Sequence, residues 1–162
     1  MRRLILSALV ALSLAGCGFT PLYGTPGVAS GLTAIQVSTP EGRVGSLLRE
    51  HLDDVLARNS ASPPTYRLTT ALAERRYPRG IRIDNVATRY EYVLVVDYRL
   101  TQISGGSGPA KTGKVRVEVT YDSADQPYAS VAAQQDAQDR AASEAARRIQ
   151  LELATWLAKP KA

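Results

Sequence analysis

Tyr90-Glu-Tyr-Val-Leu-Val-Val-Asp-Tyr-Arg-Leu100 carries the clearest structural signal in this 162-residue chain. Along most of this run, aromatic and aliphatic side chains alternate with charged ones, a period of two that is typical of a β-strand with one buried face. The face predicted to be buried holds Tyr90, Tyr92, Leu94, Val96, Tyr98 and Leu100. The opposite face carries Arg89, Glu91, Asp97 and Arg99, so we expect that side of the sheet to meet water.

Three further strands are predicted around this run. Residues 32–38 and 66–72 precede it, and residues 114–121 follow it after a turn over residues 104–109 that is rich in glycine and serine. Residues 74–82 are dense in charge and are predicted to form a loop between two strands.

Two helices complete the set of predicted elements. Apolar side chains recur at spacings of three and four residues over Val44–Leu56, and Asn59 and the Pro63-Pro64 pair are expected to end that helix. The second helix is expected from about Ser130 to Lys159, where Gly and Pro are absent and strong helix formers abound. Its apolar side is marked by Ala142, Ala145, Ile149, Leu153, Trp156 and Leu157.

The resulting order, β-α-β-β-β-α, predicts an α+β fold. Two helices with one apolar stripe each are enough to cover one face of a four-stranded sheet. We therefore expect a two-layer sandwich with both helices on one face. The helical connection allows the first two strands to run parallel, so the sheet is expected to be mixed.

The composition is that of one ordinary globular domain, and it excludes several site chemistries. Hydrophobic residues make up 44% of the chain and charged residues 22%. The single Cys rules out an internal disulfide and a Cys-rich zinc site. The single His rules out a His-based metal cluster.

The first residues have the pattern of a targeting signal. Met1-Arg2-Arg3 precedes an apolar run that ends at Ala15 and is too short to span a membrane. Leu14-Ala15-Gly16-Cys17 closes the run and resembles a bacterial lipobox, in which the Cys sulfur receives a diacylglycerol group. Gly18 in place of Asp favours the outer membrane under bacterial sorting rules. Ordinary secretion with a free or buried Cys17 is the alternative.

These features divide the chain into three parts: residues 1–16, a lipoprotein signal peptide; residues 17–31, the lipidated Cys17 and a tether; and residues 32–162, one α+β domain. In the tether, Phe19, Leu22 and Tyr23 are expected to rest at the membrane interface, on a partner or on the domain itself. An N-acyl diacylglycerol on Cys17 is the only non-protein group expected. No other cofactor and no metal are predicted.

The basic character of the chain comes partly from its targeting signal. Loss of Arg2 and Arg3 lowers the Lys and Arg count from 20 to 18 against 15 acids, so the net charge falls from +5 to about +3. Nucleic acid is therefore not an expected partner.

One motif resembles a phosphate-binding loop. Gly108-Pro-Ala-Lys-Thr-Gly113-Lys114 matches G-x-x-x-x-G-K, but Val115 follows where Ser or Thr is needed. A helix is also required next, whereas the following residues alternate as a strand. A hairpin loop is the expected role of this segment.

Two groups of side chains contain the residue types of acid–base catalysis, but neither has the arrangement that catalysis needs. Ser46, His51 and Asp54 lie on one predicted helix, and members of a catalytic triad normally converge from separate elements. A packed helix histidine is the expected role of His51. The second group consists of the carboxylates of Glu91, Asp97 and Glu118. They lie among Arg and Lys on the solvated strand faces, so no enzymatic activity is predicted.

Glu74-Arg75-Arg76-Tyr77-Pro78-Arg79-Gly80-Ile81-Arg82 is the one local concentration of charge. Guanidinium groups bind phosphate in bidentate geometry, and the interleaved Tyr77 and Ile81 add apolar surface. The candidate binding residues for a ligand that is both anionic and apolar are therefore Arg75, Arg76, Arg79 and Arg82. A solvated hairpin tip, or a contact with an acidic partner, is the alternative.

Several of these segments together resemble a known family. Leu-Ala-Gly-Cys17-Gly-Phe-Thr-Pro-Leu-Tyr-Gly24 is similar to the corresponding segment of LptE, the lipopolysaccharide-assembly lipoprotein, in its alphaproteobacterial form. The likeness continues through Tyr90–Leu100, Tyr128-Ala-Ser-Val-Ala-Ala and the long last helix. The predicted element order also fits the family fold.

The resemblance implies a non-enzymatic role in the outer membrane. Family members plug the β-barrel protein LptD, help that barrel to fold and bind lipopolysaccharide. Their basic ligand contacts lie in the loop before the third strand, where Arg79 and Arg82 match in kind, and near the start of the last helix, where residues 131–135 carry no positive charge. The alternative functions are a periplasm-facing lipoprotein adaptor of another cell-envelope complex and an envelope hydrolase.

Overall fold

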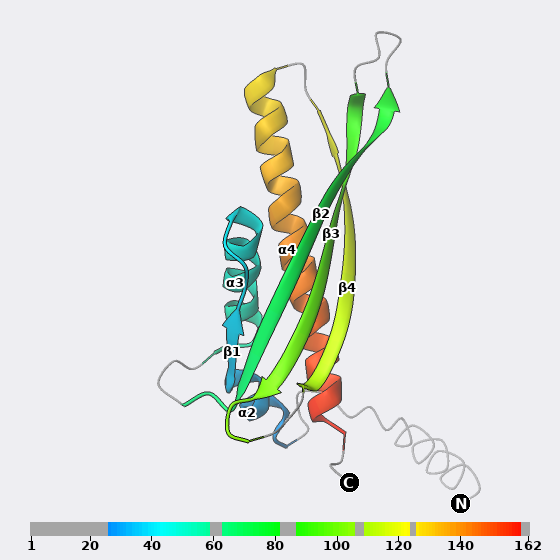
Figure 1. Ribbon diagram of the computed structural model, residues 1–162. Helices are drawn as coiled ribbons and strands as arrows, with labels where there is room; N and C mark the ends of the chain where they lie inside the picture. Colours follow the sequence, from blue (N-terminus) through cyan, green and yellow to red (C-terminus); the bar gives the residue numbers. More distant parts are fainter. Residues whose placement is uncertain (1–25, 59–62, 82–86, 106–108, 124–125, 160–162) are drawn as a thin grey trace, which may run out of the picture.

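The computed structural model describes residues 26–58, 63–81, 87–105, 109–123 and 126–159. Its elements follow one another as α2 (Val28–Thr33), β1 (Ile35–Ser38), α3 (Arg43–Val55), β2 (Tyr66–Ile81), β3 (Ala87–Gln102), β4 (Pro109–Asp122) and α4 (Pro127–Leu157). Figure 1 shows a long, twisted sheet with the helices gathered on one of its sides. The predicted two-layer α+β sandwich is therefore confirmed.

The sheet is mixed, as expected. Its strand order is β1-β2-β3-β4. β1 pairs with β2 in parallel, whereas β2–β3 and β3–β4 are antiparallel. The parallel pairing is short, because β1 spans only Ile35–Ser38 opposite Tyr66–Thr69.

The alternation predicted for β3 decides which face of the sheet is buried. Its inward-facing side chains lie in one apolar core with both long helices: Tyr92, Leu94, Val96, Tyr98 and Leu100. Asp97 and Arg99 are exposed on the other side, which we call the open face of the sheet. The open face therefore carries the charged residues, and the helix side carries the core.

The helix layer packs closely because α4 presents mainly alanines to its neighbours. Its buried residues include Ala137, Ala141, Ala142, Ala145, Ala146, Ile149, Leu153 and Ala154. Small side chains let α3 and β4 approach the axis of α4. Polar contacts fix the helices to each other and to the sheet: the Nε2 of Gln150 donates to the carbonyl of Val55 at 2.5 Å, and an Nη of Arg148 donates to the carbonyl of Arg116 on β4 at 3.0 Å.

A short helix stands where the end of the tether and the start of the first strand were predicted. The strand begins at Ile35 rather than at residue 32, and α2 occupies Val28–Thr33. Val28 and Leu32, four residues apart, are both buried in the core. Gly31 lies against Leu157, so close that a methyl group there would stand 2.9 Å from a Leu157 methyl carbon. Packing on α4 thus fixes this helix.

The prediction of a loop over residues 74–82 is wrong for residues 74–81, and Arg82 lies outside the described residues. β2 continues to Ile81, and its pairing with β3 runs on through Glu74↔Leu94 and Pro78↔Tyr90 to a bulge at Pro78–Gly80. The ladder of backbone hydrogen bonds overrides the charge density that suggested a loop. The β2–β3 hairpin consequently extends beyond α3 and lies beside the first turns of α4, at the end opposite α2 (Figure 1).

None of the helices in the described part of the chain is long and apolar enough to cross a membrane.

Candidate functional site

The arginines predicted to form one binding cluster are divided between the two faces of β2. Successive side chains on a strand point to opposite sides. Arg75 is paired across the strand with Val93 and faces the open side, whereas Arg76 is paired with Tyr92 and faces the helix side. Arg79 lies within the bulge and bonds to Glu91 on the open face. Arg82 lies outside the described residues.

Arg76 reaches from β2 to the start of α4. One Nη donates to the Oε1 of Gln134 at 2.9 Å, and the guanidinium carbon lies 4.8 Å from the centroid of the Tyr90 ring. Both partners are neutral, so they orient the guanidinium without cancelling its charge. Arg76 borders a small polar cleft of about 190 Å³, whose lining is Glu74, Arg75, Arg76, Tyr92, Gln134 and Gln138.

The single acid in this cleft is engaged by other partners. Glu74 accepts hydrogen bonds from the hydroxyl of Tyr92 at 2.7 Å and from the Nε2 of Gln138 at 3.3 Å. Burial raises the pKa of the Tyr92 hydroxyl, and its hydrogen bond to Glu74 raises it further, so Tyr92 stays protonated as the donor. Glu74 keeps its negative charge, since both of these partners are neutral, but Arg75 and Arg76 line the same cleft, so the cleft has a net positive charge that favours an anionic group.

Arg79, by contrast, is already paired. Its Nε and an Nη each donate to a different oxygen of Glu91, both at 2.9 Å. The Arg79 hydrogen bond holds the pKa of Glu91 below its usual range, and the same contact raises the pKa of Arg79. The Nε of Arg89 pairs with the Oδ1 of Asp122 at 2.8 Å, and both side chains line an open groove of about 610 Å³. Each guanidinium is already partly neutralised by its carboxylate, so either arginine would bind a ligand phosphate less strongly than an unpaired arginine would.

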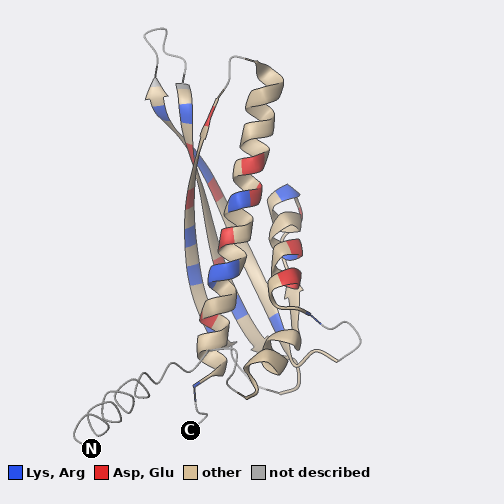
Figure 2. Ribbon diagram, turned by 180° about the vertical axis from the view of Figure 1, so that it is seen from behind, with Lys and Arg blue, Asp and Glu red and all other residues tan. Residues whose placement is uncertain are grey.

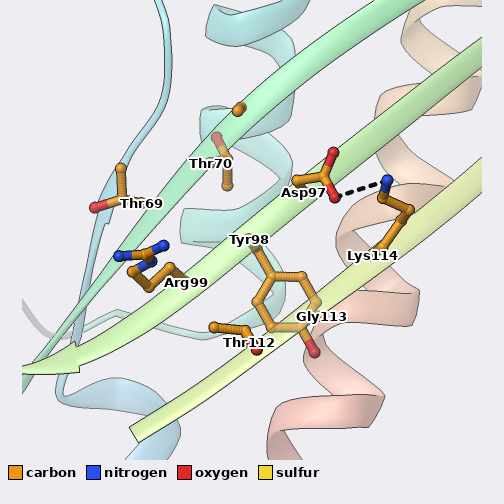
Figure 3. Close-up of a pocket in the computed structure, with 9 residues that line it drawn as sticks. Thr69, Thr70, Asp97, Tyr98, Arg99, Thr112, Gly113 and Lys114 are labelled. Atoms are coloured by element: carbon orange, nitrogen blue, oxygen red, sulfur yellow. Dashed lines mark ion pairs between the residues drawn. The ribbon is translucent and has the colours of Figure 1, made fainter. Parts of the chain in front are cut away.

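A larger groove of about 750 Å³ lies along the open face of the sheet (Figure 3). Its polar side chains come from three strands: Thr69 from β2, Asp97 and Arg99 from β3, and Thr112 and Lys114 from β4. Lys114 pairs with Asp97 at 3.2 Å. Arg99 lies between Thr69 and Thr112 in the ladder, so one cation and two hydroxyls are available for polar contacts.

The acid–base arrangements weighed from the sequence are not assembled. The Nε2 of His51 bonds to the Oδ1 of Asp139 on α4 at 2.9 Å, which explains His51 as a partly buried contact between the two long helices. Glu91, Asp97 and Glu118 each pair with a cation instead of with one another. In the parts of the chain that the structure describes, no group of three or more His, Cys, Asp or Glu side chains is placed to hold a metal ion.

Gly113, the second glycine of the motif that resembles a phosphate-binding loop, has a packing role. β4 already begins at Pro109, so Gly113 lies inside a strand and no helix follows the motif. The ring of Tyr98 passes directly over Gly113, where a Cβ atom would overlap it. The Tyr98 hydroxyl then donates a short hydrogen bond to Glu152 on α4. Sequence reasoning missed this contact, because only the pairing of β3 with β4 brings Tyr98 over Gly113.

The fold is that of small bacterial lipoproteins. The crystal structure of a Caulobacter crescentus CB15 lipoprotein superposes with a TM-score of 0.73 at 52% identity and covers 85% of this chain and 100% of its own. Rare lipoprotein B from Shewanella oneidensis and a lipoprotein B from Nitrosomonas europaea share the fold at 14% identity, with TM-scores of 0.56 and 0.52. They cover 75% of this chain, and 92% and 82% of their own. No curated protein matches the chain in sequence.

The family follows from the sequence itself. The model of the LptE family, described as lipopolysaccharide-assembly, matches residues 32–153. The chain therefore belongs to the LptE family of lipopolysaccharide-assembly lipoproteins, as the resemblance implied.

Proposed function

We propose that this chain is an outer-membrane lipoprotein that plugs an LptD-type β-barrel, assists its assembly and binds lipopolysaccharide. The family match over residues 32–153 carries this proposal. In it, the protein acts without catalysis and is held on the periplasmic side of the membrane by the acyl groups of Cys17, which lies outside the described residues.

The surface of the sheet suits the interior of a barrel. The lumen of an outer-membrane barrel is polar. On the open face, anions and cations alternate in pairs, including Asp97 with Lys114 and Glu118 with Arg116. Such a face matches a polar wall better than it matches lipid.

The ligand site is proposed at the end of the molecule where the hairpin and α4 begin to separate. Arg76, which forms no ion pair with a described residue, borders the polar cleft, and Arg75 is exposed next to it. Two apolar side chains on the first turns of α4, shortly before Gln134 in the sequence, are exposed: Tyr128 at 92% and Val131 at 54%. Cationic and apolar groups at one end suit the phosphates and acyl chains of lipopolysaccharide. Arg79 and Arg82 remain candidates, with Arg79 the weaker because of its pair with Glu91.

A pull-down from native outer membranes tests the partner. A tagged chain, extracted in mild detergent, should co-elute with a large β-barrel protein at equal stoichiometry. A lone lipoprotein, or a periplasmic complex in place of the barrel, would move the assignment to an adaptor of another envelope complex. Depletion separates the same two functions, because only loss of a barrel plug should cause lipopolysaccharide to accumulate.

Charge reversal tests the ligand site. The Arg75→Glu, Arg76→Glu double variant should weaken lipopolysaccharide binding by about tenfold or more, since charge-assisted hydrogen bonds are each worth about 1.5–3 kcal/mol. The matched control is Arg67→Glu, Arg99→Glu, which applies the same charge change to β2 and β3 near the other end of the sheet. Equal loss in both variants would argue for a non-specific charge effect and against this site.

A further inference from the structure

We infer that the end of the molecule opposite the hairpin tip is a membrane-contact surface that binds the headgroups of anionic phospholipids. We call this the basal end. It is formed by α2, the last turns of α4 and the strand ends around Tyr66 and Gln102. The inference builds on the acylation of Cys17, which belongs to the proposed function above.

The contacts at the basal end place these elements together. Trp156 of α4 packs edge-to-face on Tyr66, the first residue of β2, with ring centroids 5.8 Å apart. Gly31 of α2 lies against Leu157 of α4. Ile103, which follows β3, donates its backbone N–H to Thr65 at 3.0 Å. Figures 1 and 2 both show the chain entering and leaving the described domain at this end.

A groove of about 360 Å³ opens here between α4 and the start of β4. Its lining residues are Lys111, Leu151, Glu152, Thr155, Trp156 and Lys159. The carboxylate of Glu152 is engaged by the Tyr98 hydroxyl. The structure gives the amines of Lys111 and Lys159 no ion pair with any described residue. Because two lysines and one carboxylate line the groove, it has a net positive charge, and its walls are partly apolar.

This combination of side chains is the one found at membrane surfaces. Tryptophan concentrates at the level of lipid headgroups, and lysines next to it attract anionic lipids. Two large apolar side chains at the basal end are also exposed to solvent, Leu151 at 55% and Ile103 at 41%. Insertion of these side chains among headgroups would remove apolar area from water.

The length of chain that precedes the domain permits the contact. Cys17 is nine residues before Pro26, the first described residue. Nine residues span at most roughly 30 Å, so the acyl anchor keeps this end of the domain close to the bilayer. Lys111 and Lys159 at this end are therefore close enough to the bilayer to contact anionic headgroups.

Vesicle binding tests the inference without lipopolysaccharide or a barrel. The chain from residue 17 onward, with Cys17→Ser, carries no lipid and retains the whole described core. It should bind vesicles of phosphatidylethanolamine and phosphatidylglycerol, bind phosphatidylcholine vesicles much less, and be released by salt. Equal binding to both vesicle types, or binding to neither, would refute the inference. The pull-down described above would be unaffected by that result.

Two variants locate the contact. Lys111→Glu, Lys159→Glu should lower the partition coefficient onto anionic vesicles by at least about 25-fold, because each basic residue near such a surface contributes about fivefold. The control, Arg49→Glu, Arg140→Glu, changes the net charge by the same amount on exposed helix positions away from the groove. An equal loss in the control would show that net charge alone governs binding and would overturn the assignment.

The fluorescence of Trp156 gives a readout that needs no variant. It is the single tryptophan of the chain and lines the groove. Its emission should shift to the blue when anionic vesicles are added and should be quenched by brominated lipids. An unchanged spectrum on vesicles that do bind the protein would place the contact elsewhere on the molecule and would contradict the inference.

Discussion

The ring of Tyr98 on β3 occupies the space that any side chain at Gly113 on β4 would need. The two residues are directly paired in the ladder, and the ring crosses β4 to reach Glu152 on α4 with its hydroxyl. One glycine therefore lets the central strand form a hydrogen bond with the helix layer. The contact links the sheet and α4 at the basal end of the molecule.

Gly113→Ala should destabilise the protein by about 1–3 kcal/mol, because the added methyl group forces the Tyr98 ring out of its position. In most strands a Gly→Ala substitution leaves stability unchanged or increases it, so a decrease in the unfolding free energy would point to the contact with Tyr98. Urea denaturation measures the difference in unfolding free energy. Thr112→Ala, at the exposed neighbouring position, should change stability by less than about 0.5 kcal/mol. If Gly113→Ala is as stable as the parent, the ring does not need the glycine.

Stability should fall at alkaline pH because two tyrosines are held protonated. Burial raises the pKa of Tyr92 and of Tyr98, and hydrogen bonds to Glu74 and Glu152 raise them further. Tyrosines of the unfolded chain titrate near pH 10. Since the folded pKa values are higher, the stabilisation is complete below about pH 10 and is lost as the pH rises above it.

Denaturation curves between about pH 8 and about pH 11 check this prediction. The unfolding free energy should fall in the upper part of that range, by up to about 1.4 kcal/mol per pH unit for each tyrosine. The Tyr92→Phe, Tyr98→Phe variant should show a shallower decline. The same slope in both proteins would mean that other groups cause the alkaline loss.

Thr70→Val should stabilise the protein by about 1 kcal/mol. Thr70 is 6% exposed, and its Oγ1 has no hydrogen-bond partner in the described structure. Valine has nearly the same shape and removes the unsatisfied hydroxyl. Thr69→Val, one residue earlier on the open face, is the matched control and should have little effect. A loss of stability in Thr70→Val, measured by thermal denaturation, would show that the hydroxyl finds a partner in solution.

Glu144→Gln should remove a small stabilisation that exists only above acidic pH. Glu144 accepts from Arg148 at 2.7 Å and from Arg147 at 3.3 Å, and the Arg148 hydrogen bond is the main cause that lowers its pKa. Because the folded pKa is the lower one, the contribution is present above the unfolded pKa and is lost as the pH falls through the folded value.

The expected difference between parent and Glu144→Gln is no more than about 0.5 kcal/mol at neutral pH, since water screens this largely exposed pair. This difference should vanish at a pH so low that Glu144 is protonated in both the folded and the unfolded parent protein. Glu50→Gln on α3, for which the structure gives no ion pair with a described residue, should show no such pH-dependent difference. A difference that persists in acid would require a cause other than charge.

The sheet and the two long helices could be predicted because their patterns are long. The alternation over Tyr90–Leu100 gave the buried face of β3, and the apolar spacing over Val44–Leu56 gave α3. α2 was missed because its six residues are too few to show a period, and it contains Gly31 and Ser30, which are poor helix formers. Its formation depends on contact with Leu157, far away in the sequence.

The candidate site could be predicted only as a set of residue types. Charge density made residues 74–82 look like a loop, whereas pairing with β3 makes most of that segment a strand. Had the segment been read as a strand, alternation alone would have separated Arg75 from Arg76. The pairing of Arg79 with Glu91 could not be predicted, because it depends on the bulge at Pro78–Gly80.

The contact between Arg148 and the backbone of β4 bears on self-association. β4 forms one edge of the described sheet, and an unpaired edge is a template on which another copy can add a strand and begin a cross-β stack. The Arg148 side chain donates a hydrogen bond to the backbone carbonyl of Arg116, in the middle of that strand. β4 also carries charged side chains, among them Lys111, Lys114 and Arg116, of the kind that edge strands use to oppose pairing with another copy. The chain thus carries its own protection against fibril formation along β4.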